Sequence, residues 1–157
     1  MHGTRKHEHT NPGDKMKNNK EIMSSLLKTT QVAQIQIRSV LDNCMRPGLR
    51  KALENQLHEY DALETEAHCM TSRRGWDIPH PSPGAGFVTD VITRMKLGGK
   101  NTDSQIAGMI IQSNTKELIR GIRNRNRISG NDEPLQILSQ KLLDCETANI
   151  RQMQNYL

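Results

Sequence analysis

The segment DALETEAHCM, residues 61–70, places carboxylates and a histidine close together in a region that is predicted to be helical. Glu64 and His68 are four residues apart and therefore lie on the same side of a helix. A carboxylate and an imidazole can together bind iron, manganese or zinc, although helical zinc motifs of this spacing supply two histidines. The same spacing also suits an ion pair or hydrogen bond on the helix surface, which is the interpretation that we favour.

A second group of residues could bind anions. Its members are spaced four, three and four residues apart, which places them in one row along a helix: Lys116, Arg120, Arg123 and Arg127. Such a row can contact the phosphates of a nucleic acid. No aromatic side chain lies between its members to stack on bases, and no nucleic-acid-binding motif surrounds it. We favour a solvated helix face, with an anionic partner, protein or nucleic acid, as the alternative.

The other chemically active residues form no recognised motif. Cys44, Cys69 and Cys145 are far apart and lack a CxxC spacing, which argues against a zinc knuckle or a disulfide framework. The sequence has no glycine-rich phosphate loop and no GxSxG motif. It therefore predicts no catalytic residue, no bound cofactor and no small-molecule substrate.

Composition favours packed helices in one domain. The chain has 157 residues, of which 34% are hydrophobic but only 3% aromatic, so its core must consist of Leu, Ile, Met and Ala. No apolar run approaches the roughly 18 residues of a membrane span, and we expect a cytoplasmic protein. Residues 1–20 supply +3 of the net charge of +5, so the rest is nearly neutral.

The N-terminal residues differ from the rest of the chain. Residues 1–15 are polar, include a Pro-Gly pair, and are predicted to form a disordered arm. His2, His7 and His9 in this arm could bind metal only weakly, because a flexible segment does not hold ligands in place. Residues 16–157 are predicted to form a single four-helix-bundle domain.

Apolar residues three or four apart predict four long helices at about 18–44, 47–75, 103–128 and 134–157. The second has heptad spacing, which is typical of bundle packing. The expected apolar face of the third consists of Ala107, Ile110, Ile111, Leu118 and Ile122.

The connections predict the topology. Short links within the first and second pairs of helices make each pair an antiparallel hairpin. Residues 76–102 are long enough to traverse the bundle as a crossover, and an apolar-periodic piece predicts a short helix within them. A simple up-down-up-down bundle is the competing topology.

Two hairpins joined by a long crossover, with polar residues in mid-helix, resemble the ferritin-like group over residues 18–157. The similarity is to its small bacterial branch, which includes spore-coat-like proteins, and it suggests a bacterial and spore-associated protein. Ferritin-like di-metal sites take one Glu from each of two helices and a Glu-x-x-His motif from each of the other two. The resemblance places Gln34 and Asn114 at the first two positions, and Glu64 and Glu146 in the two motifs.

The implied metal site is degenerate. Ala67 and Asn149 stand where the two motif histidines belong, and amides are poor ligands for Fe(II) and Mn(II). A buried polar network would be an alternative use of these positions, since buried polar groups can fix helix register; its candidate members are Gln34, Glu64, Asn114 and Asn149. Side chains at the edge of the apolar stripe would instead meet water.

Three functions therefore stay open. We favour a non-enzymatic structural or protein-interaction bundle that self-associates or binds a protein partner. The first alternative is a metal-binding ferritin relative that uses Glu64, Glu146 and His68 for iron, manganese or zinc. The second is a nucleic-acid-associated accessory protein that uses the row of Lys116, Arg120, Arg123 and Arg127.

Overall fold

A computed structural model describes residues 11–78, 95 and 98–157. Four long helices occupy these residues, and no strand is present among them. They are α1 (Pro12–Val40), α2 (Pro47–Arg73), α4 (Thr102–Asn126) and α5 (Glu133–Gln154), with a short 3-10 turn at Leu41–Asn43. The prediction of an all-α, four-helix architecture is confirmed.

The first helix begins earlier and ends earlier than the sequence predicts. Residues 12–15 were expected in a disordered arm, but they form the first turn of α1. The side chain of Asn11 accepts a hydrogen bond from the backbone N–H of Gly13 at 3.2 Å, and Pro12 occupies the first turn. A proline there begins a helix rather than breaking one, because its missing N–H would have no helical partner. The expected short helix and crossover path largely lie outside the described residues.

One end of the bundle, the Asp103 end, is held by a carboxylate at the start of α4. The backbone N–H groups of Met45 and Arg46 donate to Asp103 at 2.7 and 3.0 Å. The guanidinium of Arg46 also donates to Asp103, at 3.1 Å, and lies over the ring of Tyr156. The start of α2, the start of α4 and the end of α5 therefore meet at the Asp103 end.

The opposite end, the Asp132 end, is held by a carboxylate before α5. Arg74 donates two hydrogen bonds to Asp132, both at 2.7 Å. Asn19 donates to Asp132 at 3.1 Å and to the backbone carbonyl of Ser129 at 3.0 Å. The start of α1, the end of α2 and the α4–α5 turn therefore meet at the Asp132 end.

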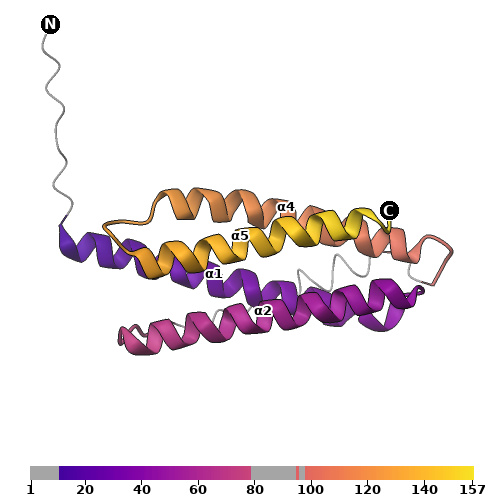
Figure 1. Ribbon diagram of the computed structural model, residues 1–157, viewed down its shortest axis with the longest axis horizontal. Coiled ribbons are helices and arrows are strands. Elements are labelled where there is room, and N and C mark those ends of the chain that lie inside the picture. The colour runs from indigo at the N-terminus through magenta and orange to yellow at the C-terminus, as the bar shows by residue number, and fades with distance from the viewer. Residues whose placement is uncertain (1–10, 79–94, 96–97) are drawn as a thin grey trace, which may run out of the picture.

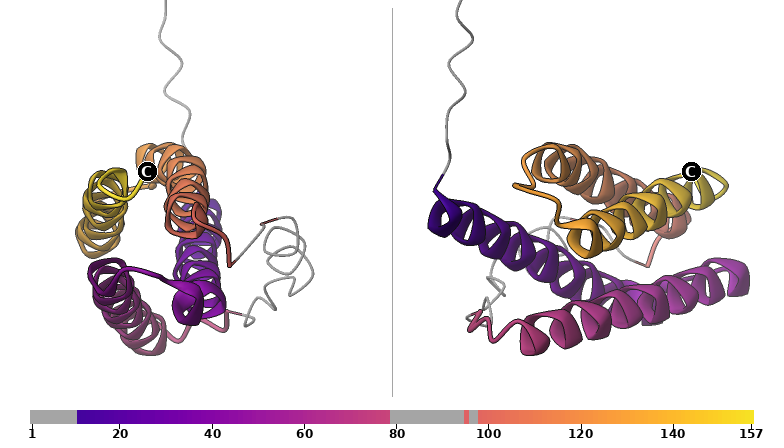
Figure 2. Two further views of the ribbon diagram at one scale, coloured as in Figure 1. Left: turned by 90° about the vertical axis from the view of Figure 1, so that its right-hand side faces the viewer. Right: turned by 60° about the vertical axis from the view of Figure 1, so that its left-hand side comes forward.

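These contacts fix the direction of every helix. In Figure 1, α1 and α5 run from left to right, whereas α2 and α4 run from right to left. Among the described helices α4 follows α2, and the two are parallel, so the chain leaves the first hairpin at the Asp132 end and enters the second at the Asp103 end. An alternating up-down-up-down order is incompatible with these directions. Figure 2 shows the two hairpins packed face to face.

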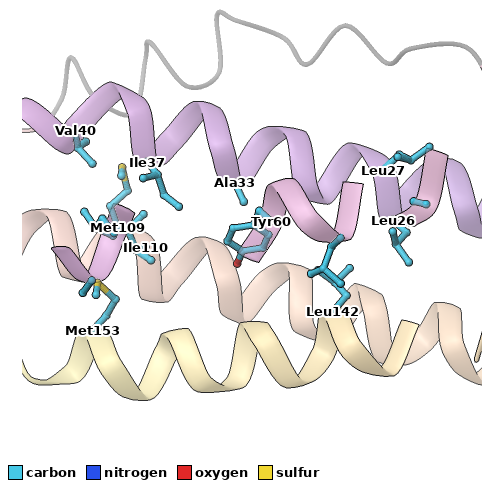
Figure 3. Close-up of a cluster of buried hydrophobic side chains, with 14 of the residues drawn as sticks. Leu26, Leu27, Ala33, Ile37, Val40, Tyr60, Met109, Ile110, Leu142 and Met153 are labelled. Carbon is cyan, nitrogen blue, oxygen red and sulfur yellow. The ribbon is translucent and has the colours of Figure 1, made fainter. Parts of the chain in front are cut away.

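The interior is built from Leu, Ile, Met and Ala around one aromatic residue. Figure 3 shows Tyr60 in the middle of the cluster, with its hydroxyl oxygen pointing toward the side where α4 and α5 lie. The expected apolar face of α4 is partly wrong. Ile122 is 38% exposed, because Ile106, Ala107 and Ile110 set the buried direction of this helix and Ile122 is turned away from it. None of the described helices has an apolar stretch that could cross a membrane.

Candidate functional site

Polar side chains occupy the centre of the bundle. Gln34, Asn114, Glu146 and Asn149 are all buried, and they come from α1, α4 and α5. On α5 the two polar residues continue the row of buried Leu138 and Leu142 at helical spacing, which explains why the fold takes them inside. Their burial raises the question of where their hydrogen bonds go.

Glu64 lies at the boundary between α1 and α2. Its carboxylate accepts hydrogen bonds from the side-chain amides of Gln34 and, at 3.3 Å, Gln31. The His68 Nε2 atom lies 3.5 Å from Glu64 Oε1, so the spacing noted in the sequence does bring these two side chains together. Arg38 in turn donates to the oxygen of Gln34 at 3.3 Å. Glu64 is thus satisfied within the first hairpin.

The surroundings of Glu146 differ from those of Glu64. Its residue is 1% exposed, and neither carboxylate oxygen has a hydrogen-bond partner among the residues that the structure describes. The amide nitrogen of Asn114, a residue that is 4% exposed, also lacks a partner. The hydroxyl of Tyr60, a residue that is 1% exposed, is approached by the side chain of Asn149. These buried groups come from α5, α4 and α2. We call Tyr60, Asn114 and Glu146 the buried centre.

Burial controls the charge of this centre. Removal from water, followed by the nearby charge of Glu117, raises the pKa of Glu146 to about 8. The neutral acid is therefore the favoured form at pH 7. Burial, and then the charge of Glu146, also raise the pKa of Tyr60 well above its ordinary value. A protonated Glu146 offers one O–H donor and a carbonyl acceptor, whereas the ionised form offers acceptors only.

Asn149 and Cys145 are in contact with each other beside the buried centre, and both act on Tyr60. The amide of Asn149 lies 3.5 Å from the sulfur of Cys145, and the Cys145 thiol donates to Glu59 at 3.3 Å. Burial and then the charge of Glu59 raise the pKa of the Cys145 thiol. This thiol therefore stays protonated, and it lacks the lowered pKa that a nucleophilic cysteine requires.

Two residues of the site were not recognised in the sequence. Tyr60 falls at a heptad position among the apolar residues of α2, where its hydroxyl gives no periodic signal. Glu117 belongs to no motif, but it follows Asn114 by three residues and so shares its side of α4. Glu117 accepts from the Thr29 hydroxyl at 2.9 Å and from Arg120 at 3.2 Å, which places it between α1 and α4.

The donor set does not fit a di-metal centre of the ferritin-like kind. Such a centre needs carboxylates and imidazoles that converge inside the bundle. Within the described ranges, no three His, Cys, Asp or Glu residues are close enough to hold one ion. Glu64 is bound by amides of α1, whereas Glu146 lies near the Tyr60 phenol and neither of its oxygens has a partner among the described residues. A metal at Glu146 would also have to displace a proton.

The basic row of α4 lies outside this centre. Lys116, Arg120, Arg123 and Arg127 are all exposed, as their spacing predicted. Arg120 is paired with Glu117, and the side chain of the neighbouring Arg125 instead donates to Gln140 of α5.

Comparison with known proteins supports the fold. No protein-family model matches this sequence, and no curated protein matches it significantly. Among solved structures, it is similar to the crystal structure of a conserved hypothetical protein from Mycobacterium tuberculosis, with a TM-score of 0.63 and 10% sequence identity. The match covers 94% of this chain and 100% of the other. At this identity the likeness shows a shared helical fold and nothing about the site.

Proposed function

We propose that this protein is a ferritin-like bundle of structural or protein-interaction type, without enzymatic activity, whose centre takes up a proton where its relatives hold metals. The helix directions support the ferritin-like part of the proposal. Parallel α2 and α4, each within an antiparallel hairpin, require one long connection, which is the connectivity of ferritin-like folds. The resemblance noted in the sequence suggests a bacterial origin, with a cytoplasmic or spore-associated location.

The different surroundings of Glu64 and Glu146 carry the proposal. These are the two glutamates that the resemblance assigns to metal-binding motifs, and a di-metal centre requires both at one point. Glu64 instead completes a hydrogen-bonded group with Gln34, and Glu146 belongs to the buried centre. Because the two carboxylates have different surroundings, we infer that these motif positions now serve the structure of the bundle.

A structural role for these positions has a physical basis. A buried polar group is costly unless it finds its intended partner, so it penalises any other alignment of the helices. Gln34 and Glu64 align α1 with α2. Glu146 lies near enough to Tyr60 for its charge to raise the pKa of that phenol, so α5 meets α2 at the buried centre. A bundle with a fixed register presents constant outer faces, which a self-associating or partner-binding protein needs.

Metal retention tests the proposal. The full chain, with His2, His7 and His9 replaced by alanine, would be loaded anaerobically with Fe(II), Mn(II) or Zn(II), desalted and measured by mass spectrometry. We expect retained metal far below one ion per chain, because the donors do not converge. Near-stoichiometric metal that is lost in Glu64→Ala or Glu146→Ala would contradict the proposal and favour the metal-binding alternative with Glu64, Glu146 and His68.

A further inference from the structure

We propose that the outer surface shared by α1 and α4 binds the phosphate backbone of a duplex nucleic acid. This inference goes beyond the structural role and does not depend on it. The surface, here called the basic face, is defined by exposed cations of two neighbouring helices: Lys17, Lys28, Lys116, Arg120, Arg123 and Arg127.

The α4 part of the basic face is a straight row on a rigid element. At 1.5 Å per residue, its successive members are about 4.5 or 6 Å apart, and the row from Lys116 to Arg127 is about 16 Å long. One strand of a duplex presents about five phosphates over that length. Three of the four cations are arginines, whose planar guanidinium groups match phosphate oxygens in pairs.

Side-chain contacts place α1 directly beside this row. Asn18 donates to the backbone carbonyl of Arg127 at 2.7 Å, and Asn124 donates to the Ser25 hydroxyl at 3.0 Å. Lys28 follows Ser25 by three residues and so shares its side of α1. The contact between Ser25 and α4 therefore brings Lys28 to the edge of the basic row.

The same register brings Lys17 to this surface. It precedes Glu21 by four residues, and Glu21 precedes Ser25 by four, so all three lie in one row on α1.

Few acids offset these cations. Asp14 and Glu21 lie in the α1 row, and Glu117 lies between the helices, so three acids stand against six cations. Glu117 is already engaged by Thr29 and Arg120, which reduces its repulsion of an incoming anion. The basic face therefore keeps a positive excess.

The chemistry of the face favours a nucleic acid over a membrane or an acidic protein. The basic row contains no apolar side chain that could enter a lipid surface. The exposed Ile119 borders the row, since it follows Lys116 by three residues and precedes Arg123 by four, whereas the exposed Ile122 lies about 100° around the helix from Arg123. A single apolar side chain is too small a surface to anchor the helix in a membrane. Because the row also lacks aromatic residues for stacking, we expect contacts to phosphates without reading of bases.

Fluorescence anisotropy with labelled DNA and RNA duplexes of about 20 base pairs tests this inference directly. For the full chain we expect binding that weakens steeply between about 50 and 200 mM salt, with a log–log slope near −3 or steeper. The variant Arg120→Gln/Arg123→Gln/Arg127→Gln should bind at least about tenfold more weakly and should lose about 2–3 units of that slope. Glutamine retains good helix propensity, so circular dichroism should show an unchanged helix content.

A matched control removes the same charge elsewhere. Lys51→Gln/Arg73→Gln/Arg151→Gln changes exposed cations on α2 and α5 and should keep nearly the full affinity. Equal losses in the two triple variants would overturn the inference, because net charge alone would then explain binding. So would absence of duplex binding, equally effective competition by polyglutamate, or stronger binding to phosphatidylserine vesicles than to the duplexes. Retained metal would overturn the structural proposal and leave this one unaffected.

Discussion

Replacement of Glu146 by glutamine is expected to stabilise the protein above pH 8 and to flatten its stability between about pH 5 and 8. In the folded protein the pKa of Glu146 is raised from 4.5 to about 8, mainly by burial. The folded state therefore holds a proton that the unfolded state releases, and wild-type stability falls as pH rises through this window. Above pH 8 the folded protein must bury an ionised carboxylate. Glutamine is neutral at every pH and avoids that cost, which amounts to about 3–5 kcal/mol.

Urea unfolding at a series of pH values from 5 to 9 measures this effect. The exposed Glu21→Gln variant serves as the control and should keep the wild-type dependence on pH. Parallel curves for wild type and Glu146→Gln would contradict the account, since they would mean that Glu146 has the same pKa in both states.

Replacement of Asp132 by alanine is expected to destabilise the protein by about 2–4 kcal/mol. Asp132 accepts two hydrogen bonds from Arg74 and one from Asn19, and it caps the first turn of α5 through the backbone N–H of Leu135. Its loss removes a helix cap and leaves the half-buried guanidinium of Arg74 without its carboxylate. The hydrogen bonds from Arg74 lower the pKa of Asp132. Its contribution is therefore present above about pH 4 and disappears as pH falls through the lowered pKa.

A double-mutant cycle with Arg74→Ala isolates the contact between the hairpins. We expect the double variant to be much less unstable than the sum of the single changes, because both remove the same interaction. Asp144→Ala, an exposed carboxylate on the same helix, is the control and should change the free energy of unfolding by less than about 0.5 kcal/mol. Additive effects of Arg74→Ala and Asp132→Ala would show that the pair does not join the hairpins.

The helices were predictable where local signals mark their ends. Pro47 and Pro134 occupy first turns, and the structure begins α2 and α5 at or beside them. The start of α1 was not predictable in the same way, because Pro12-Gly13 suits a turn as well as a helix start. What decides it is the cap by Asn11, whose side chain bonds the backbone only once the helix has formed.

The buried positions were easier to predict than their partners. Helical periodicity places Asn114 and Glu146 on inward faces, and both are buried. Periodicity does not specify how the helices are aligned along and around their axes. That alignment brings Glu64 to Gln34, and it places Glu146 near Tyr60. It also turns Ile122 toward solvent.

The protonation state of Glu146 is the most direct test of a centre that holds a proton in place of metal. Infrared difference spectra of wild type minus Glu146→Gln would be recorded at pH 6 and pH 10, on either side of the pKa of about 8. The account predicts the carbonyl band of a buried carboxylic acid at pH 6, replaced by carboxylate bands at pH 10. Carboxylate bands at both pH values would contradict it, because an ionised Glu146 inside the bundle would require a cation beside it.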